Sequence, residues 1–200
     1  LMKRWKMPRT KEQVIALRLA EMTGLPENFP DFIEFGAAFE GPFHFSPGEN
    51  LWGSGQSAGY VWFIQAGYGF DKMDLEDGTT MLNGMIEPGL FVCDEKNLLW
   101  GELTASSAKM YTHATVYRLD AAQWRTFVYE HPEFRAILYR VNAHFLQMRK
   151  LRLIKMKHKD KRAYWEETKA RFPGIELYCT QTEIASYFGV SKSTMHRIMK

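Results

Sequence analysis

Few residues of the chain have the types and spacing that catalysis or metal binding requires. The segment Gly55–Gly59, "GQSAG", matches the G-x-S-x-G motif of hydrolases, in which a strand precedes the serine and a helix follows it. Here a strand-like segment follows instead, so the glycines favour a β-turn. The six histidines are scattered, and the two cysteines, Cys93 and Cys179, lie far apart. This pattern favours neither an enzyme nor a metal site, and we expect no cofactor.

The clearest chemical signal is a group of hydrogen-bond donors and cations near the end of the chain. Side chains of these types suit phosphate oxygens and guanine edges. We expect Lys192, Ser193 and Arg197 to read base edges, and most of the others to contact phosphates. The residues predicted to contact DNA are Gln181, Ser191, Lys192, Ser193, Thr194, His196, Arg197 and Lys200.

Two short predicted helices that meet at a glycine would position these donors. Thr180 and Glu183 have the spacing of a capping box at the start of the first helix. Gly189 suits the left-handed residue that ends this helix, and Ser191 can cap the next one. Ala185 is small enough for the two helices to cross there. The pattern is typical of a helix-turn-helix, although a plain αα-hairpin packed on another element is the alternative.

The middle of the chain has the texture of an antiparallel β domain. The segments Tyr60–Ala66, Tyr68–Met73 and Ala114–Leu119 are rich in β-branched and aromatic residues, with turn signals between them. The "EDG" at Glu76–Gly78 suits a hairpin turn. We expect a β-roll, preceded by a helix within Lys11–Met22 and by a loop that contains two prolines.

A long helix is expected after this β-roll. From Glu133 to about Lys161 the chain has neither glycine nor proline, and apolar residues recur at three- and four-residue steps. This stripe could pack on the β-roll of the same chain, on a second copy of the helix, or on both in succession. Its members are Phe134, Ile137, Leu138, Val141, Phe145, Met148 and Leu151.

Charge is unevenly distributed along the 200 residues. Residues 1–130 hold 11 Lys and Arg against 17 Asp and Glu, whereas residues 131–200 hold 15 against 6. The basic second part favours a polyanionic partner, although a solvated basic helix face is the alternative. The chain has no apolar run of membrane-spanning length, and its cysteine usage suits a reducing cytoplasm.

These elements together resemble the Crp/Fnr family of bacterial transcription regulators. The segment Phe45–Phe70 resembles the family's Pro-Gly-Glu, a spaced glycine and an aromatic-rich strand. The "EPGLF" at Glu87–Phe91 resembles the Pro-Gly that precedes the family's phosphate-binding cassette. The final 21 residues, "TQTEIASYFGVSKSTMHRIMK", fit the family's helix-turn-helix without a gap.

The resemblance implies an α+β fold in three parts and a homodimer bound to double-stranded DNA. An antiparallel β-roll of the double-stranded β-helix or jelly-roll kind would form a sensor domain over residues 1–130. A dimerisation helix would cover residues 131–160, and a helix-turn-helix domain residues 161–200. The residues expected in the dimer interface are Phe134, Leu138, Val141, Phe145 and Met148.

The family's cassette holds a cyclic nucleotide with a Gly-Glu pair and a later Arg-Ser pair, and this chain departs from both. Aligned without gaps, these pairs fall on Cys93-Asp94 and Thr104-Ala105; with a deletion, they fall on Gly101-Glu102 and Ser106-Ser107. Neither register supplies an arginine, and an unpaired phosphate charge in a pocket is costly. We therefore expect no binding of cyclic AMP or cyclic GMP, and either another small-molecule effector or none.

The family's β-hairpin wing normally follows the recognition helix. The sequence ends at Lys200, so either it is shortened or the chain is a variant that lacks a full wing. We expect the variant, which would lose some phosphate contacts. Its DNA affinity would be modest, or would depend on a partner such as RNA polymerase. Two other classes compete with this interpretation. One is a small-molecule-binding β-barrel whose helical tail docks a partner protein, and the other is a metal enzyme, whose histidine and carboxylate set the strands lack.

Overall fold

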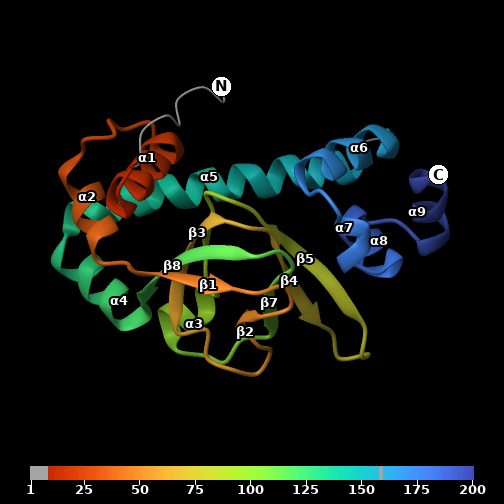
Figure 1. Ribbon diagram of the computed structural model, residues 1–200, viewed down its shortest axis with the longest axis horizontal. Helices are drawn as coiled ribbons and strands as arrows, with labels where there is room; N and C mark the ends of the chain where they lie inside the picture. Colours follow the sequence, from red (N-terminus) through yellow and green to blue (C-terminus); the bar gives the residue numbers. More distant parts are fainter. Residues whose placement is uncertain (1–8, 158–159) are drawn as a thin grey trace.

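The computed structural model describes residues 9–157 and 160–200, and it shows an antiparallel β-roll joined by one long helix to a small helical bundle (Figure 1). This arrangement confirms the expected α+β fold. The strands are β1 (Glu40–Phe45), β2 (Asn50–Trp52), β3 (Tyr60–Ala66), β4 (Gly69–Asp74), β5 (Thr80–Ile86), β6 (Phe91–Val92), β7 (Ser106–Met110) and β8 (Ala114–Asp120). The helices are α1 (Lys11–Thr23), α2 (Pro30–Ala37), α3 (Glu95–Trp100), α4 (Ala121–Glu130), α5 (Pro132–Lys157), α6 (Lys161–Arg171), α7 (Ile175–Tyr178), α8 (Gln181–Phe188) and α9 (Lys192–Met199).

The β-roll consists of two four-stranded antiparallel sheets, ordered β1-β8-β3-β6 and β2-β7-β4-β5. Apolar side chains from both sheets form one core, in which Ile64, Met110 and Val116 are fully buried. The predicted turn at Glu76–Gly78 connects β4 to β5, and Gly78 has the positive φ of 78° that such a turn requires. The two sheets do not close into a barrel.

Helix α2 corrects the sequence-based prediction of a loop in this region. Pro30 occupies its first turn, where a missing N–H costs nothing and the fixed φ suits a helix. Helices α1 and α2 pack closely at Gly36, where there is no room for a side chain. A Cβ atom added there would lie only 2.9 Å from the Glu12 Cα atom. Their apolar sides join Phe134 of α5 in a second core.

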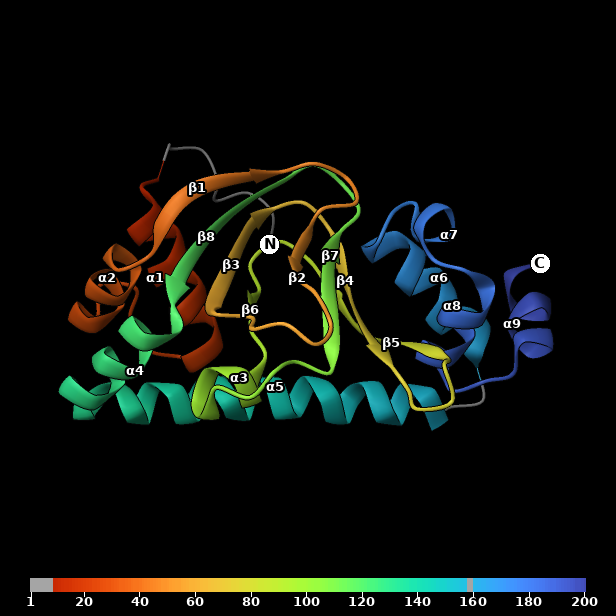
Figure 2. The same cartoon turned by 90° about the horizontal axis from the view of Figure 1, so that it is seen from below.

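Helix α5 runs along the whole β-roll from α4 to the helical bundle (Figure 2). Its first half is anchored by Phe134, Ile137 and Val141, which are buried among side chains of α1 and α2. The described part of the helix extends to Lys157, within the predicted range 131–160. His158 and Lys159 lie outside the described residues.

The C-terminal bundle, α6 to α9, is built around Trp165 and Phe188, both fully buried. Their core also contains Phe70, Leu82 and Tyr111 from the β-roll. The helical bundle and the β-roll therefore share buried side chains across the predicted boundary at residue 161.

Candidate functional site

Capping residues form hydrogen bonds with the free backbone groups at the ends of the two short helices of the helix-turn-helix and so fix where each helix begins and ends. The Glu183 N–H donates to Thr180 Oγ1 at 3.2 Å, and the Thr180 N–H donates to Glu183 Oε2 at 2.7 Å, which confirms the predicted capping box. Gly189 ends α8 with a φ of 62°, in the left-handed region that favours glycine. Ala185 is buried, as its small size predicts.

The outward side of α9 presents most of the residues predicted to contact DNA. Met195 is fully buried against the bundle, so the opposite side of α9 faces solvent. Both views place α9 at the end of the molecule, beyond α8 and far from α1 and α2 (Figures 1 and 2). The exposed donors and cations are Lys192, Ser193, His196, Arg197 and Lys200.

The other three predicted residues make contacts within the motif. The Ser191 hydroxyl caps α9 by accepting a hydrogen bond from the Thr194 N–H at 3.2 Å. The Gln181 side-chain nitrogen lies 3.2 Å from Nδ1 of His196 and so links the start of α8 to α9. The structure therefore brings all eight residues together around α9.

The helix-turn-helix is held against the β4–β5 hairpin by a mixed contact. Lys72 Nζ donates to Glu183 Oε1 at 2.7 Å, and the Leu82 N–H donates to Ser186 Oγ at 3.0 Å. Burial alone would raise the pKa of Glu183, but hydrogen bonds from Lys72 and Thr180 outweigh it and hold this pKa below its usual range. Lys72 and Glu183 are more than 100 residues apart, so no sequence pattern indicated this pair.

Arg152 of α5 strengthens the same junction. Its Nη1 donates to the Asn83 carbonyl oxygen at 2.5 Å, and its guanidinium carbon lies 3.8 Å from the centre of the Tyr187 ring. One side chain therefore connects α5, β5 and α8. Cation–π contacts of this kind are strongest where solvent is partly excluded.

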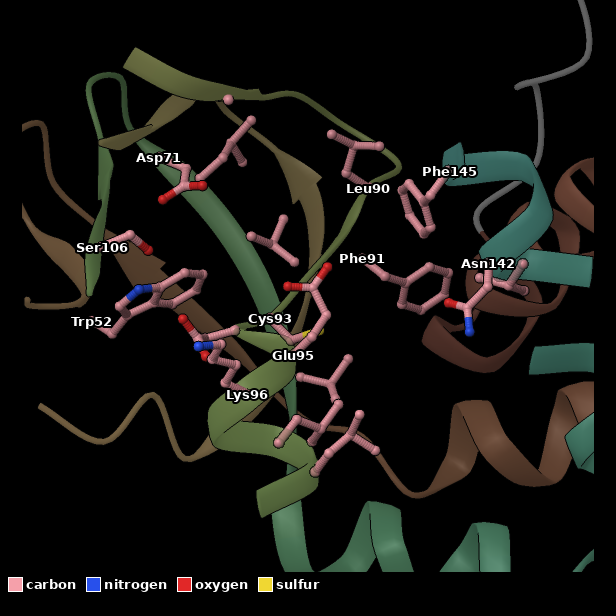
Figure 3. A pocket seen from close by; sticks show the side chains of 18 of the residues that line it. Trp52, Asp71, Leu90, Phe91, Cys93, Glu95, Lys96, Ser106, Asn142 and Phe145 are labelled. Atoms are coloured by element: carbon pink, nitrogen blue, oxygen red, sulfur yellow. The ribbon is translucent and has the colours of Figure 1, made fainter. Parts of the chain in front are cut away.

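A cavity of about 730 Å³ lies between the β2-β7-β4-β5 sheet, α3 and the middle of α5 (Figure 3). Trp52, Asp71 and Ser106 form a polar region on the sheet side. Phe91 and Phe145 line the side nearer to α5, as Figure 3 shows. Trp52 and Asp71 were missed by the sequence analysis, because each stands in an unremarkable strand.

Five of the eight predicted ligand-binding residues line this cavity: Cys93, Asp94, Glu102, Ala105 and Ser106. Gly101, Thr104 and Ser107 do not line it. Thr104 is buried, and its hydroxyl lies 3.0 Å from the carbonyl oxygens of Gly53 and Ser106. Burial raises the pKa of Cys93 to about 12, so its thiol stays protonated and is a poor nucleophile.

Helix α3 discriminates between the two cassette registers. Cys93 and Asp94 precede its N-terminus, whereas Gly101 ends it with a φ of 72° and Glu102 follows. The N-terminus of a helix favours an anion and the C-terminus disfavours one, so the geometry favours the gapless register. Asp94 Oδ1 already accepts a hydrogen bond from the Asn97 N–H at 2.8 Å, which places a carboxylate at this helix end.

No protein-family description and no curated protein sequence matches the chain. Solved structures do match. The c-di-GMP-responsive global regulator CLP of Xanthomonas campestris superposes with a TM-score of 0.58 at 15% identity, over 82% of this chain and 86% of CLP. FixK2 of Bradyrhizobium japonicum gives a TM-score of 0.60 at 17% identity, over 80% and 82% of the two chains. The Catabolite Activator Protein of Thermus thermophilus gives 0.53 at 18% identity, over 91% and 84%.

The chain has the Crp/Fnr-like fold. Within this fold, α5 occupies the place where the sequence analysis expected a dimerisation helix. The apolar residues of α5 lie on two different sides of the helix. Phe134 and Val141, which were predicted in the dimer interface, are buried in the core of their own subunit at 0% and 8% exposure and so offer little surface to a partner. Leu138 and Phe145 also pack partly against that core.

A second apolar stripe of α5 faces solvent. Tyr139, Leu146 and Leu153 follow one another at seven-residue steps and are 78%, 64% and 56% exposed. Met148 is 39% exposed and lines a small cavity beneath α6. The stripe predicted from the sequence is therefore buried by the chain itself only in its first part, from Phe134 to Val141, whereas Leu151 near its end is 43% exposed.

Among the described residues, no group of three or more histidine, cysteine, aspartate and glutamate side chains could hold a metal ion. In the same part of the chain, no helix combines the length and the apolar character needed to cross a membrane.

Proposed function

We propose that the chain is a cytoplasmic, homodimeric, DNA-binding transcription regulator of the Crp/Fnr type, with an effector site in the β-roll. The observation that carries this proposal is the outward face of α9, where five donor or cationic side chains stand exposed at one end of the molecule. An α-helix with such a face suits the major groove of B-DNA. The solved structures of similar fold include transcription regulators, which supports the assignment.

We assign each residue a role from the exposure and the length of its side chain. Arg197 and Lys192 would contact guanine edges, with Ser193 beside them, because long cationic side chains suit the acceptors of guanine. Ser191 and Thr194 lie at the N-terminus of α9, where backbone N–H groups and hydroxyls suit a phosphate. Gln181 and Lys200 would add phosphate contacts at the two ends of the motif, and His196 a further donor.

The dimer would form through the exposed stripe of α5, centred on Tyr139, Leu146 and Leu153. Apolar residues at seven-residue steps are typical of paired helices, and exposed patches of this kind are uncommon on monomers. A dimer with this axis would present two copies of α9 to successive turns of DNA. The proposal replaces the inward residues Phe134 and Val141 as the dimer contact.

We also propose that cyclic AMP and cyclic GMP are not effectors. In the favoured register Thr104 replaces the family's arginine, and its one hydroxyl hydrogen is already taken by a backbone carbonyl, since two lie 3.0 Å away. The arginine that lines the cavity, Arg149, is 3.0 Å from the Glu95 carboxylate. With Asp94 capping α3, a nucleotide phosphate would meet a carboxylate where it requires a donor.

The central test selects duplexes from a random DNA library with the full chain and measures their affinity by fluorescence anisotropy at several salt concentrations. We expect Arg197→Ala to weaken binding about tenfold to a hundredfold and to relax selectivity at one base pair. Arg135→Ala removes the same charge from exposed α5 and should leave affinity unchanged. If the chain bound no duplex in a salt-dependent way, the alternative would stand, in which the helical tail docks a protein.

Dimerisation has its own test. Leu146→Lys should convert the dimer to a monomer in sedimentation and should reduce operator affinity on the order of a hundredfold, because two linked half-sites reinforce each other. Gln147→Lys introduces the same charge at the next exposed position and is the matched control. A dimer that persisted in the Leu146→Lys variant would place the interface elsewhere.

A further inference from the structure

The polar floor of the cavity is created by one row of residues across the sheet. Trp52 of β2 and Asp71 of β4 both pair with Ala108 of β7, one from each side. Residues directly opposite in an antiparallel sheet point to the same face, so the indole and the carboxylate flank a small alanine. Asp71 also pairs with Gly84 of β5, which leaves further space beside the carboxylate.

A β-bulge in β5 gives Asp71 a hydrogen-bond partner. The register shifts between Asp71 and Lys72, so that Asp71 pairs with Gly84 and Lys72 pairs with Leu82, which leaves Asn83 without a partner across the ladder. The Asn83 side-chain nitrogen then donates to Asp71 Oδ2 at 2.6 Å. Bulges redirect side chains in this way and are frequent beside functional sites.

The other oxygen of this carboxylate has no partner. Asp71 Oδ1 is buried and accepts no hydrogen bond among the described residues, although Ser106 lies near enough to favour the charged form. Trp52 is 5% exposed, and its indole N–H is likewise buried without an acceptor in that part of the chain. Two residues that line the same cavity thus each keep an unsatisfied polar atom, one an acceptor and the other a donor, and an unsatisfied buried polar group is costly.

The electrostatic surroundings of Asp71 are negative. Desolvation raises the pKa of Asp71, and the nearby carboxylates of Glu95 and Asp94 raise it further. Four carboxylates line the cavity against two cationic side chains. Both cations are engaged, because Arg149 lies 3.0 Å from Glu95 and Lys96 lies 3.9 Å from Glu102. This field disfavours an anion and favours a cation.

We propose that the cavity binds a small organic cation with an apolar body, such as a protonated amine or amidine. Its N–H group donates to Asp71 Oδ1, an acceptor atom next to the charge receives the Trp52 N–H, and the apolar body packs against Phe91 and Phe145 (Figure 3). The cavity volume of about 730 Å³ lies within the usual range of small-molecule binding sites. The inference specifies the chemical class of effector for the proposed sensor.

The first experiment compares two probes of similar shape and opposite charge, 2-phenylethylammonium and 3-phenylpropanoate, by isothermal titration calorimetry on the full chain without DNA. We expect the cation to bind at least tenfold more tightly than the anion, and Asp71→Asn to reduce its affinity about tenfold or more. Asp74→Asn makes the same change on the same strand, outside the cavity, and should bind as the wild type does.

Thermal unfolding of each variant shows whether it is folded. No cation binding at millimolar concentration, tighter binding of the anion or of cyclic AMP, or wild-type affinity in Asp71→Asn would each overturn the proposal. Because no DNA is present, these results are independent of the operator-binding tests. DNA binding could fail while the cation binds, and the reverse could also occur.

A second experiment examines Trp52. Below the pKa of its α-amino group, phenylalaninamide carries the same ammonium and phenyl groups as the first probe, with a carbonyl acceptor beside the charge, so both probes are compared at a pH where each is fully protonated. We expect it to bind about threefold to tenfold more tightly than 2-phenylethylammonium, and we expect Trp52→Phe to remove this advantage because it keeps a ring and deletes the donor. An advantage that survived in Trp52→Phe would exclude the indole N–H from ligand recognition.

Discussion

The helix-turn-helix and the cavity floor differ in whether their buried polar side chains have hydrogen-bond partners. Between Thr180 and Lys200 no buried side-chain polar atom lacks a hydrogen-bond partner, and the capping box and the Lys72–Glu183 pair satisfy the start of α8. Outside this range, Arg152 Nε and Trp165 Nε1 are buried without a partner among the described residues. On the cavity floor, Asp71 and Trp52 each keep one buried polar atom without a partner. The first region is complete by itself and presents its donors outward. The second is incomplete until something else occupies it.

The two regions lie back to back on one hairpin. Asp71 faces the cavity, and the next residue, Lys72, reaches Glu183 at the start of α8. Asn83 offers its side chain to Asp71 and its carbonyl oxygen to Arg152. A satisfied contact and an unsatisfied one are therefore separated by a single peptide unit, so substitutions on the two sides should differ in sign as well as in size.

The largest effect is expected in the helical bundle, where Phe188 is fully buried between Tyr164 and Trp165. Phe188→Ala would leave a cavity in the bundle and should cost about 3–5 kcal/mol of unfolding free energy, measured by urea denaturation. Phe188→Leu keeps most of the volume and should cost much less. A loss under about 1 kcal/mol for the alanine variant would contradict the tight packing.

The Lys72–Glu183 pair should rank second. Both side chains are mostly buried, at 24% and 14% exposure, so the pair is poorly screened. Lys72→Met keeps the aliphatic stem and should lose about 1.5–3 kcal/mol at neutral pH, as expected for a charge-assisted hydrogen bond. Lys109→Met on the neighbouring strand β7 is exposed and serves as the control.

The pH dependence of this pair has a definite sign. Because the pKa of Glu183 is lower in the folded state than in the unfolded state, its stabilisation is present above the unfolded pKa. It is lost as the pH falls through the folded pKa, where the carboxylate protonates. The stability difference between wild type and Lys72→Met should therefore shrink on acidification. A difference that stayed constant down to acid pH would show that the pair contributes no charge interaction.

The capping box should give a smaller effect. Thr180→Ala removes the acceptor for the Glu183 N–H and should cost about 1 kcal/mol, whereas Thr180→Ser retains the hydroxyl and should be close to wild type. Urea denaturation of the two variants measures the difference. Equal losses in both would mean that the threonine methyl group, and not the cap, stabilises α8.

The parts of the fold that could be predicted from the sequence depend on residues that are close together along the chain. Thr180, Glu183 and Gly189 act within a few residues of one another, and the structure confirms each of their roles. The strands β3, β4 and β8 also follow the predicted segments to within a residue at each end. Caps and alternating strands depend on near neighbours, so the sequence alone contains them.

The cavity floor and the α5 faces were not predictable for the opposite reason. Trp52, Ala108 and Asp71 meet only because three strands pair in a specific order and register. The apolar stripe of α5 was recognised, but periodicity does not identify the partner, and α1 and α2 of the same chain cover Phe134 and Val141. Tertiary placement decides both features.

The smallest expected effect concerns Asp71, and it should have the opposite sign. Asp71→Asn replaces a desolvated carboxylate by a neutral side chain of the same shape, so the variant without ligand should range from no change to a gain of about 1 kcal/mol. The pKa of Asp71 is raised in the folded state, so folding favours its protonated form. The wild type should therefore gain stability as the pH falls from above the folded pKa to below the unfolded pKa, and the asparagine variant should lack this gain.

This pH profile separates a ligand-binding role from a structural one. If the carboxylate held the hairpin together, neutralising it would destabilise the protein, and Asp71→Asn would be less stable than the wild type at neutral pH, with the two converging in acid. A carboxylate left free for a ligand gives the reverse order, with the variant at least as stable as the wild type at neutral pH and the two converging in acid. Urea denaturation at three pH values, with Asp74→Asn as the exposed control, distinguishes the two outcomes.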